Sequence, residues 1–154
     1  MEGSLNRIRS IADYEYGKGI GELIFPDNVQ IEYSHNTGRI RYISLNGKRI
    51  ATLRPTDGRL SLSISTARDI AKNAPTAHCF VTIRQDISKF VAEGGDVFAA
   101  HIVNVDPEIH AKDEVIVLDE KGHVMAVGRA FLSANEMMAF KTGVAVKVRH
   151  GCGT

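Results

Sequence analysis

Short strand-forming segments separated by turn signals recur along this sequence. The dipeptide Asn46–Gly47 is a strong signal for a two-residue hairpin loop, and RPTDG over 54–58 is a second turn. Strand-like runs continue from both turns and return several times after Pro75. Many short strands beside a few brief helices are typical of a small β-barrel. The expected strands cover roughly 29–34, 39–45, 48–54, 59–65, 78–84, 96–105, 113–118, 123–132 and 144–150.

Helical periodicity is confined to a few segments. Apolar residues at helical spacing predict an amphipathic helix over 5–16, which YGKGIG then ends, and a second helix is expected over about 66–74. Pro75 marks a plausible boundary between two parts. We therefore expect an α+β domain over residues 1–75, followed by a mainly-β domain over 76–154.

Two brief helices are predicted in the second part. One covers about 87–93, with Asp86 or Ser88 as its N-cap. It is expected to bury Ile87, Phe90 and Val91. The other opens at SANE, where Ser133 at the N-cap and Glu136 three residues later form a capping box.

Two adjacent glycines, Gly94 and Gly95, follow the first of these helices. Gly94 fits the C′ position, where a left-handed residue closes a helix at little steric cost. Gly95 is not needed for that purpose, and a residue without Cβ allows close approach by another backbone, either of this chain or of a ligand. A tight helix-to-strand turn without a ligand is the alternative interpretation.

The net charge of +1 predicts no partner by itself, but the charges are unevenly distributed. Six basic residues and one acid lie between 39 and 59, whereas six acids and one lysine lie between 106 and 120. From Lys141 to the end there is no acid. The basic segment coincides with the predicted hairpin.

The Asn46–Gly47 loop predicts the register of that hairpin. Arg39 falls opposite Arg54, a like-charge pair that an anion between them would relieve. Phosphate is the first candidate anion, and an acidic surface of a partner protein is the second; two arginines splayed into solvent is the alternative. The predicted cationic face holds Arg39, Arg41, Lys48 and Arg54 beside Ile43 and Ile50. The predicted core face holds Ile40, Tyr42, Ala51 and Leu53.

No catalytic or metal-binding pattern stands out. The six histidines show no metal-ligand spacing, GKGIG lacks the P-loop pattern, and DPEIHAKDE is interpreted as a solvated acidic turn. No segment reaches the roughly 20 apolar residues of a membrane span, and the start has no apolar leader. The two cysteines are far apart. A cytoplasmic protein without metal or cofactor is expected.

The second part resembles the PUA domain, a module named for pseudouridine synthases and archaeosine transglycosylases. The resemblance covers about 78–151 and lies in EGGDVFA, VDPEI, DEVIVLD, AVGRAFLSANEM and GVAVKVRHG, in that order. It implies a β pseudo-barrel that binds RNA along its first helix, the glycine loop, the next strand and the last strand. Carried over to this chain, the loop is Gly94, Gly95 and Asp96, and the adjoining strand begins with Val97, Phe98 and Ala99.

The last strand, VAVKVRH, adds cations to this implied surface. Alternation places Ala145, Lys147 and Arg149 outward, opposite in direction to the three valines of the strand. Lys147, Arg149 and Lys141 would neutralise phosphate, and Phe98, if exposed, could stack on a base. His101 is expected to share a strand face with Ala99 near the loop; a packed or surface histidine is the alternative.

The first part resembles the segment that precedes the PUA domain in archaeal tRNA-guanine transglycosylases. The resemblance lies in IADYEYGKGIGELIFP, TGRIRYISLNG and ATLRPTDG. It implies a non-catalytic module without the enzyme's barrel, which binds the acceptor end of tRNA for a transglycosylase on a separate chain, in archaeosine modification. The alternatives are a PUA-type protein acting in ribosome biogenesis or translation, and a small enzyme with an unrecognised site.

Overall fold

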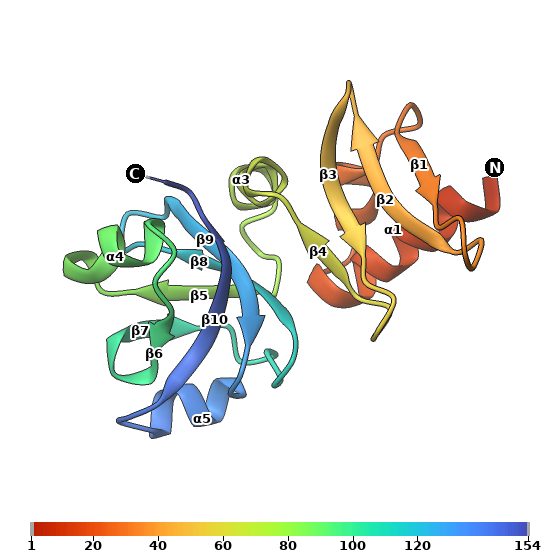
Figure 1. The fold of residues 1–154 in the computed structure, drawn as a ribbon. Helices are drawn as coiled ribbons and strands as arrows, with labels where there is room; N and C mark the ends of the chain where they lie inside the picture. The colour runs from red at the N-terminus through yellow and green to blue at the C-terminus, as the bar shows by residue number, and fades with distance from the viewer. Residues whose placement is uncertain (1, 154) are drawn as a thin grey trace. The chain divides into compact units, whose positions relative to one another are not determined.

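The computed structural model describes residues 2–153 of the chain, which divide into two compact units between Ala77 and His78. The first unit contains three helices and a four-stranded sheet (Figure 1). The helices are α1 (Glu2–Tyr16), α2 (Ile20–Ile24) and α3 (Ile64–Asn73). The antiparallel strands, in spatial order, are β1 (Gln30–Tyr33), β2 (Ile40–Leu45), β3 (Lys48–Leu53) and β4 (Leu60–Leu62).

The core of the first unit lies between its helices and one face of the sheet. Ile8 and Tyr16 of α1 are fully buried together with Ile43 and Leu60 of the sheet. The Tyr16 hydroxyl donates a hydrogen bond to the carbonyl oxygen of Leu60, which ties the end of α1 to β4. Helix α2 was not predicted, because its five residues are too few to show a helical period.

The predicted hairpin is present, but its register is only partly right. Leu45 pairs with Lys48 as expected, and a bulge between Ile43 and Ser44 then shifts the pairing, so that Ile43 lies opposite Ala51 rather than Ile50. A bulge turns the side chains beyond it to the other face. Ile43 and Ile50 are therefore buried in the core instead of lying beside the cations. Tyr42, placed in the core by the prediction, is only half-buried.

The second unit is a mixed sheet that nearly closes on itself. Its spatial order is β6-β10-β9-β8-β5-β7, and the edge strands β6 and β7 are consecutive in the chain, joined by the short 3-10 helix η2 (Ala99–His101). The strands are β5 (Phe80–Ile83), β6 (Val97–Phe98), β7 (Ile102–Val105), β8 (Glu114–Leu118), β9 (Val124–Ala130) and β10 (Val144–Gly151). The expected fold, an α+β part followed by a mainly-β pseudo-barrel, is confirmed.

Helices lie at the ends of this barrel. They are η1 (Gln85–Ile87), α4 (Ser88–Ala92) and α5 (Ala134–Ala139), and Figure 1 shows α4 and α5 at opposite ends of β10. Ser133 and Glu136 form the predicted capping box. The predicted N-cap of the first helix is wrong: Asp86 pairs with Arg84, and the Ser88 hydroxyl donates to the carbonyl oxygen of Gln85.

The barrel core is filled by small and branched apolar side chains. Val81, Ile83, Val97 and Val146 are fully buried in it. Ala145 is fully buried too, so its predicted outward orientation is wrong.

None of the helices in the part of the chain that the structure describes is long and apolar enough to cross a membrane.

Candidate nucleic-acid interface

The glycine loop begins where α4 ends. Gly94 has a φ of 106°, and its N–H donates to the carbonyl oxygen of Val91 at 2.9 Å. The N–H of Gly95 donates to the carbonyl oxygen of Phe90 at 3.0 Å. These two bonds are the pair that defines a Schellman motif with Gly94 at C′. The predicted role of Gly94 as the helix terminator is therefore confirmed.

A contact within the chain explains why residue 95 is a glycine. A Cβ built on Gly95 would lie 2.2 Å from an atom of the Phe90 ring, so the ring occupies the space that a side chain would need. Phe90 is 54% exposed, and its predicted burial is wrong. The ring covers the loop from the solvent side instead of entering the core.

Asp96 connects the glycine loop to the last strand. One carboxylate oxygen accepts the backbone N–H of Val148 at 3.0 Å, and the other lies 3.4 Å from the Lys147 ammonium. The Lys147 side chain is 61% exposed, so its cation stands at the surface directly beside the loop. The structure thus brings together the loop and the strand that the sequence assigned to one surface.

Arg149 has a different environment. Its guanidinium pairs with the carboxylate of Glu114 on β8, a side chain that is only 3% exposed. Arg129 on β9 lies opposite Lys147 on one side and Glu114 on the other, and its Nε is buried without a hydrogen-bond partner among the described residues. Arg129 was not among the predicted site residues, and it lies half-buried between buried neighbours on β9. Lys147 is the more exposed of the two cations predicted on the last strand.

The strand after the loop is shorter than predicted. Val97 and Ala99 are buried, and the chain leaves β6 at Phe98 to form η2. Ala99 and His101 therefore do not share a strand face, since both lie in a 3-10 turn. Phe98 is 38% exposed, and the ring of His101 meets it edge-on at 6.0 Å between centroids. The Nδ1 of His101 is buried without a hydrogen-bond partner in the described part of the chain.

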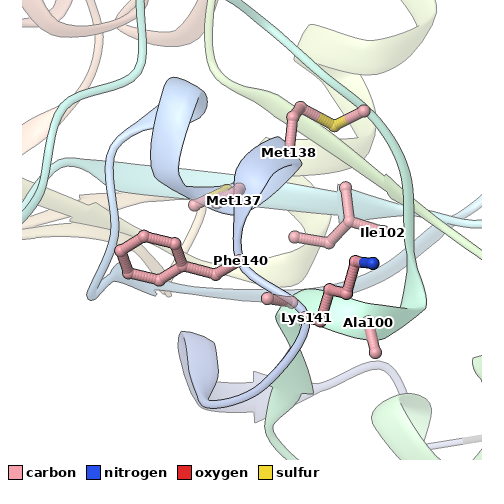
Figure 2. Close-up of a pocket in the computed structure, with 7 residues that line it drawn as sticks. Ala100, Ile102, Met137, Met138, Phe140 and Lys141 are labelled. Carbon is pink, nitrogen blue, oxygen red and sulfur yellow. The ribbon is translucent and has the colours of Figure 1, made fainter.

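An open groove of about 370 Å³ lies between η2 and α5 (Figure 2). Lys141 supplies its one charged side chain, which Figure 2 shows extending toward Ile102. Met138 and Phe140 are both about half exposed at this groove. The groove is lined by Ala99, Ala100, Ile102, Met137, Met138, Phe140 and Lys141. It combines apolar surface with a single cation, a composition suited to an unpaired base beside a phosphate.

The basic hairpin of the first unit does not form the expected Arg39–Arg54 pair. Arg54 pairs instead with Asp57 in the following turn, at 2.6 Å. Arg39 and Lys48 are exposed, and Arg41 is half-buried. The conflict that suggested an anion between Arg39 and Arg54 is therefore relieved within the chain.

Two arginines lie against Tyr42 in this hairpin. The guanidinium carbons of Arg49 and Arg41 lie 3.5 Å and 5.3 Å from the centre of the Tyr42 ring. Tyr42 was predicted to lie in the core, and Arg49 had no predicted role. The available signal was the dipeptide Arg41–Tyr42 on one strand of the hairpin and Lys48–Arg49 on the other.

No group of three or more potential metal ligands occurs within residues 2–153. The buried carboxylate of Asp119 accepts hydrogen bonds from the backbone N–H groups of Lys121 and His123 and from the side-chain amide of Gln85. Burial acts to raise the pKa of Asp119, but these hydrogen bonds outweigh it and hold the pKa below its usual range. The arrangement orders the turn between β8 and β9.

The two units match two protein families. Residues 6–76 match the patch-forming domain C2 of tRNA-guanine transglycosylase, and residues 80–152 match the PUA domain.

Curated relatives match nearly the whole chain. The tRNA-guanine(15) transglycosylase of Methanothermobacter thermautotrophicus is 40% identical over 147 residues, which are 96% of this chain and 22% of that enzyme. The enzyme of the same name from Pyrococcus furiosus is 37% identical over 97% of this chain and 25% of its own length. The chain spans about a quarter of these relatives, in their C-terminal part and outside their catalytic region.

Solved structures share the fold of both units. A hypothetical protein from Pyrococcus horikoshii superposes with a TM-score of 0.79, at 22% identity, over 100% of this chain and 93% of that one. A conserved PUA domain protein from Thermoplasma acidophilum gives a TM-score of 0.69, also at 22% identity, over 99% of this chain and 91% of its own. These matches identify the fold.

Proposed function

We propose that this chain is a tRNA-binding module without catalysis of its own. The chain belongs to the PUA-domain family, and it carries the patch-forming C2 domain of tRNA-guanine transglycosylase before its PUA domain. The observation that carries the proposal is the Asp96 contact, which holds the glycine loop beside the exposed cation Lys147. The transglycosylase relatives make tRNA the first candidate RNA.

The chemistry of the surface supports RNA more than a small-molecule substrate. Lys147 and Lys141 are exposed cations at the glycine loop and at the η2–α5 groove, and they would neutralise phosphate groups. Phe98 offers a partly exposed ring on which a base could stack. The proposed RNA contacts are Gly94, Gly95, Asp96, Phe98, His101, Lys141, Lys147 and Arg149, with the buried Val97 and Ala99 shaping the backbone beneath them.

The proposed module assists a catalytic centre on another chain. Because the matched part of the relatives lies outside their catalytic region, we propose that a separate transglycosylase chain supplies the chemistry. In this proposal the PUA unit holds the acceptor end of tRNA, in the cytoplasm, while the partner acts on a distant base. This division of roles requires only that the PUA unit and the separate transglycosylase chain bind the same tRNA molecule.

A charge-reversal experiment tests the RNA surface. We expect K147E to lower the affinity for a tRNA transcript about tenfold and to flatten its dependence on salt, because a phosphate contact is replaced by repulsion. The matched control is K121E, which reverses an exposed lysine in the β8–β9 turn. Equal affinities of the two variants, or no binding by the unchanged protein at low salt, would contradict the proposal.

The RNA and protein that co-purify with the native chain test the partner. Recovery of tRNA together with a larger transglycosylase chain is the expected result. Recovery of ribosomal RNA instead of tRNA would contradict the proposed tRNA binding and would favour a role in ribosome biogenesis or translation.

A further inference from the structure

The arginine–tyrosine cluster of the first unit consists of Arg41, Tyr42 and Arg49. Ser44 pairs with Arg49 across the hairpin, and Tyr42 lies two residues from Ser44 on the same strand face. Arg49 therefore reaches the Tyr42 ring diagonally, as long side chains do in antiparallel sheets. The 3.5 Å separation between its guanidinium carbon and the ring centre is that of a stacked cation–π pair.

Both arginines keep their hydrogen-bonding capacity for a ligand. Within residues 2–153, neither Arg41 nor Arg49 takes part in an ion pair or a side-chain hydrogen bond. The Nε of Arg41 is buried and unpartnered. A guanidinium that stacks on an aromatic ring still directs its N–H groups outward in its own plane, where they match a phosphate with two oxygens.

The surrounding charges favour an anion. Strands β1, β2 and β3 contain Lys48 in addition to the two arginines, and Glu32 is their one acid. Glu32 pairs with Tyr42 across β1 and β2, so it faces the cluster and offsets part of its charge. Arg39 adds a further exposed cation just before β2. Positive charge exceeds negative charge around the ring.

We infer that Arg41, Tyr42 and Arg49 form a second binding site, which takes a phosphate group of an RNA backbone. The inference rests on the proposed RNA binding and extends it to the first unit. Tyr42 orients the arginines, and the exposed guanidinium of Arg49 stacked on its ring offers a neighbouring base a flat surface. An acidic protein surface would fit the charge but would make no use of this flat surface.

Paired substitutions test this site. The variant R41Q/R49Q removes two cations of the cluster, and the control R68Q/K72Q removes two exposed cations of α3 in the same unit. Affinity for a tRNA transcript is measured over a range of KCl concentrations. We expect the slope of log affinity against log salt to become shallower by about 1 to 2 in R41Q/R49Q, because each phosphate contact contributes about 0.9. The control should keep the slope of the unchanged protein.

Further outcomes separate this inference from the proposed function. R49Q alone keeps the half-buried Arg41 and should show about half the slope change, so a folding defect in the double variant does not end the test. If K147E weakens binding but R41Q/R49Q behaves as R68Q/K72Q, the second site is wrong and the proposed function stands. If the unchanged protein binds no RNA, both are overturned. If R41Q/R49Q keeps the salt dependence of tRNA binding but no longer binds an acidic protein partner, the second site is also overturned.

Discussion

The carboxylate of Asp96 accepts the backbone N–H of Val148 at 3.0 Å, across 52 residues of sequence. This bond fixes the loop after α4 to the middle of β10, and the same carboxylate lies beside the Lys147 ammonium. The proposed RNA site therefore has an intramolecular acid at its centre. We expect the bond to Val148 to stabilise the fold, and we expect the negative charge beside Lys147 to weaken RNA binding.

We expect D96A to lower the free energy of unfolding by about 1–2 kcal/mol, because the N–H of Val148 loses its acceptor. D96N retains an acceptor oxygen and should cost less. It also removes the negative charge beside Lys147, so tRNA affinity should rise slightly. Urea unfolding and filter binding measure the two effects. Equal unfolding of D96A and the unchanged protein would mean that the bond does not stabilise the loop.

Two glycine substitutions should differ in cost. A Cβ on Gly151 would lie 2.1 Å from the carbonyl oxygen of Ala92, so G151A forces the backbones of β10 and α4 apart. We expect it to lower the free energy of unfolding by about 1–3 kcal/mol. G95A meets the ring of Phe90, which is exposed and can rotate away, and should cost less. Thermal unfolding compares them, and a larger loss in G95A would refute this account.

The Arg149–Glu114 pair should matter more for stability than for RNA. Glu114 is only 3% exposed, and breaking a buried ion pair by removing one partner typically costs about 3–5 kcal/mol. We therefore expect R149A to unfold at a much lower urea concentration than K147A. The double variant R149M/E114Q should recover part of the loss, because it removes both charges of the pair. A similar midpoint for R149A and K147A would contradict the prediction.

Asp119 should contribute to acid sensitivity. Its pKa is lower in the folded protein than in the unfolded chain, so its stabilising effect is present above about pH 4 and is lost as the pH falls through the folded-state pKa. D119N should be less stable than the unchanged protein at pH 7, and the difference should narrow below about pH 4. Urea unfolding at several pH values measures this. A constant difference from pH 7 to pH 2 would rule it out.

The two free thiols should react at different rates. Cys79 is 1% exposed, and burial, assisted by the negative charge of Asp106, raises the pKa of its thiol far above the usual range. Cys152 is partly exposed. A disulfide reagent such as Ellman's should therefore modify one thiol in the native protein and both in urea. C152S should abolish the reaction of the native protein, and rapid reaction of Cys79 there would disprove the burial argument.

Local signals predicted the elements better than their contacts. The Asn46–Gly47 loop, the capping box at Ser133 and the helix terminator Gly94 are present as predicted, because each depends on the backbone preferences of a few adjacent residues. The hairpin register failed one step beyond its turn, at the bulge after Ile43. A bulge depends on which side chains the core accepts, and no residue of the turn encodes it.

The expected site shows the same division. The resemblance to the PUA domain placed the glycine loop and the last strand on one surface, and the Asp96 contact joins them. It did not show that Phe90 covers Gly95, or that Glu114 holds Arg149. The first contact depends on how the Phe90 side chain is oriented at the end of α4, and the second joins residues 35 positions apart in the sequence.

By itself, the amino-acid sequence determined most of the order of the secondary structure, the two-part architecture and the main turns, since period, glycine and capping residues act over a few neighbours. It missed α2 and the break between β6 and β7. Only the tertiary structure decided which cations remain at the surface: Lys147 is 61% exposed although it lies beside Asp96, whereas Arg54 and Arg149 are only 19% and 28% exposed beside their acids. Long charged side chains reach partners several ångströms away, and which partner is within reach is set by strand pairing and burial rather than by adjacent residues.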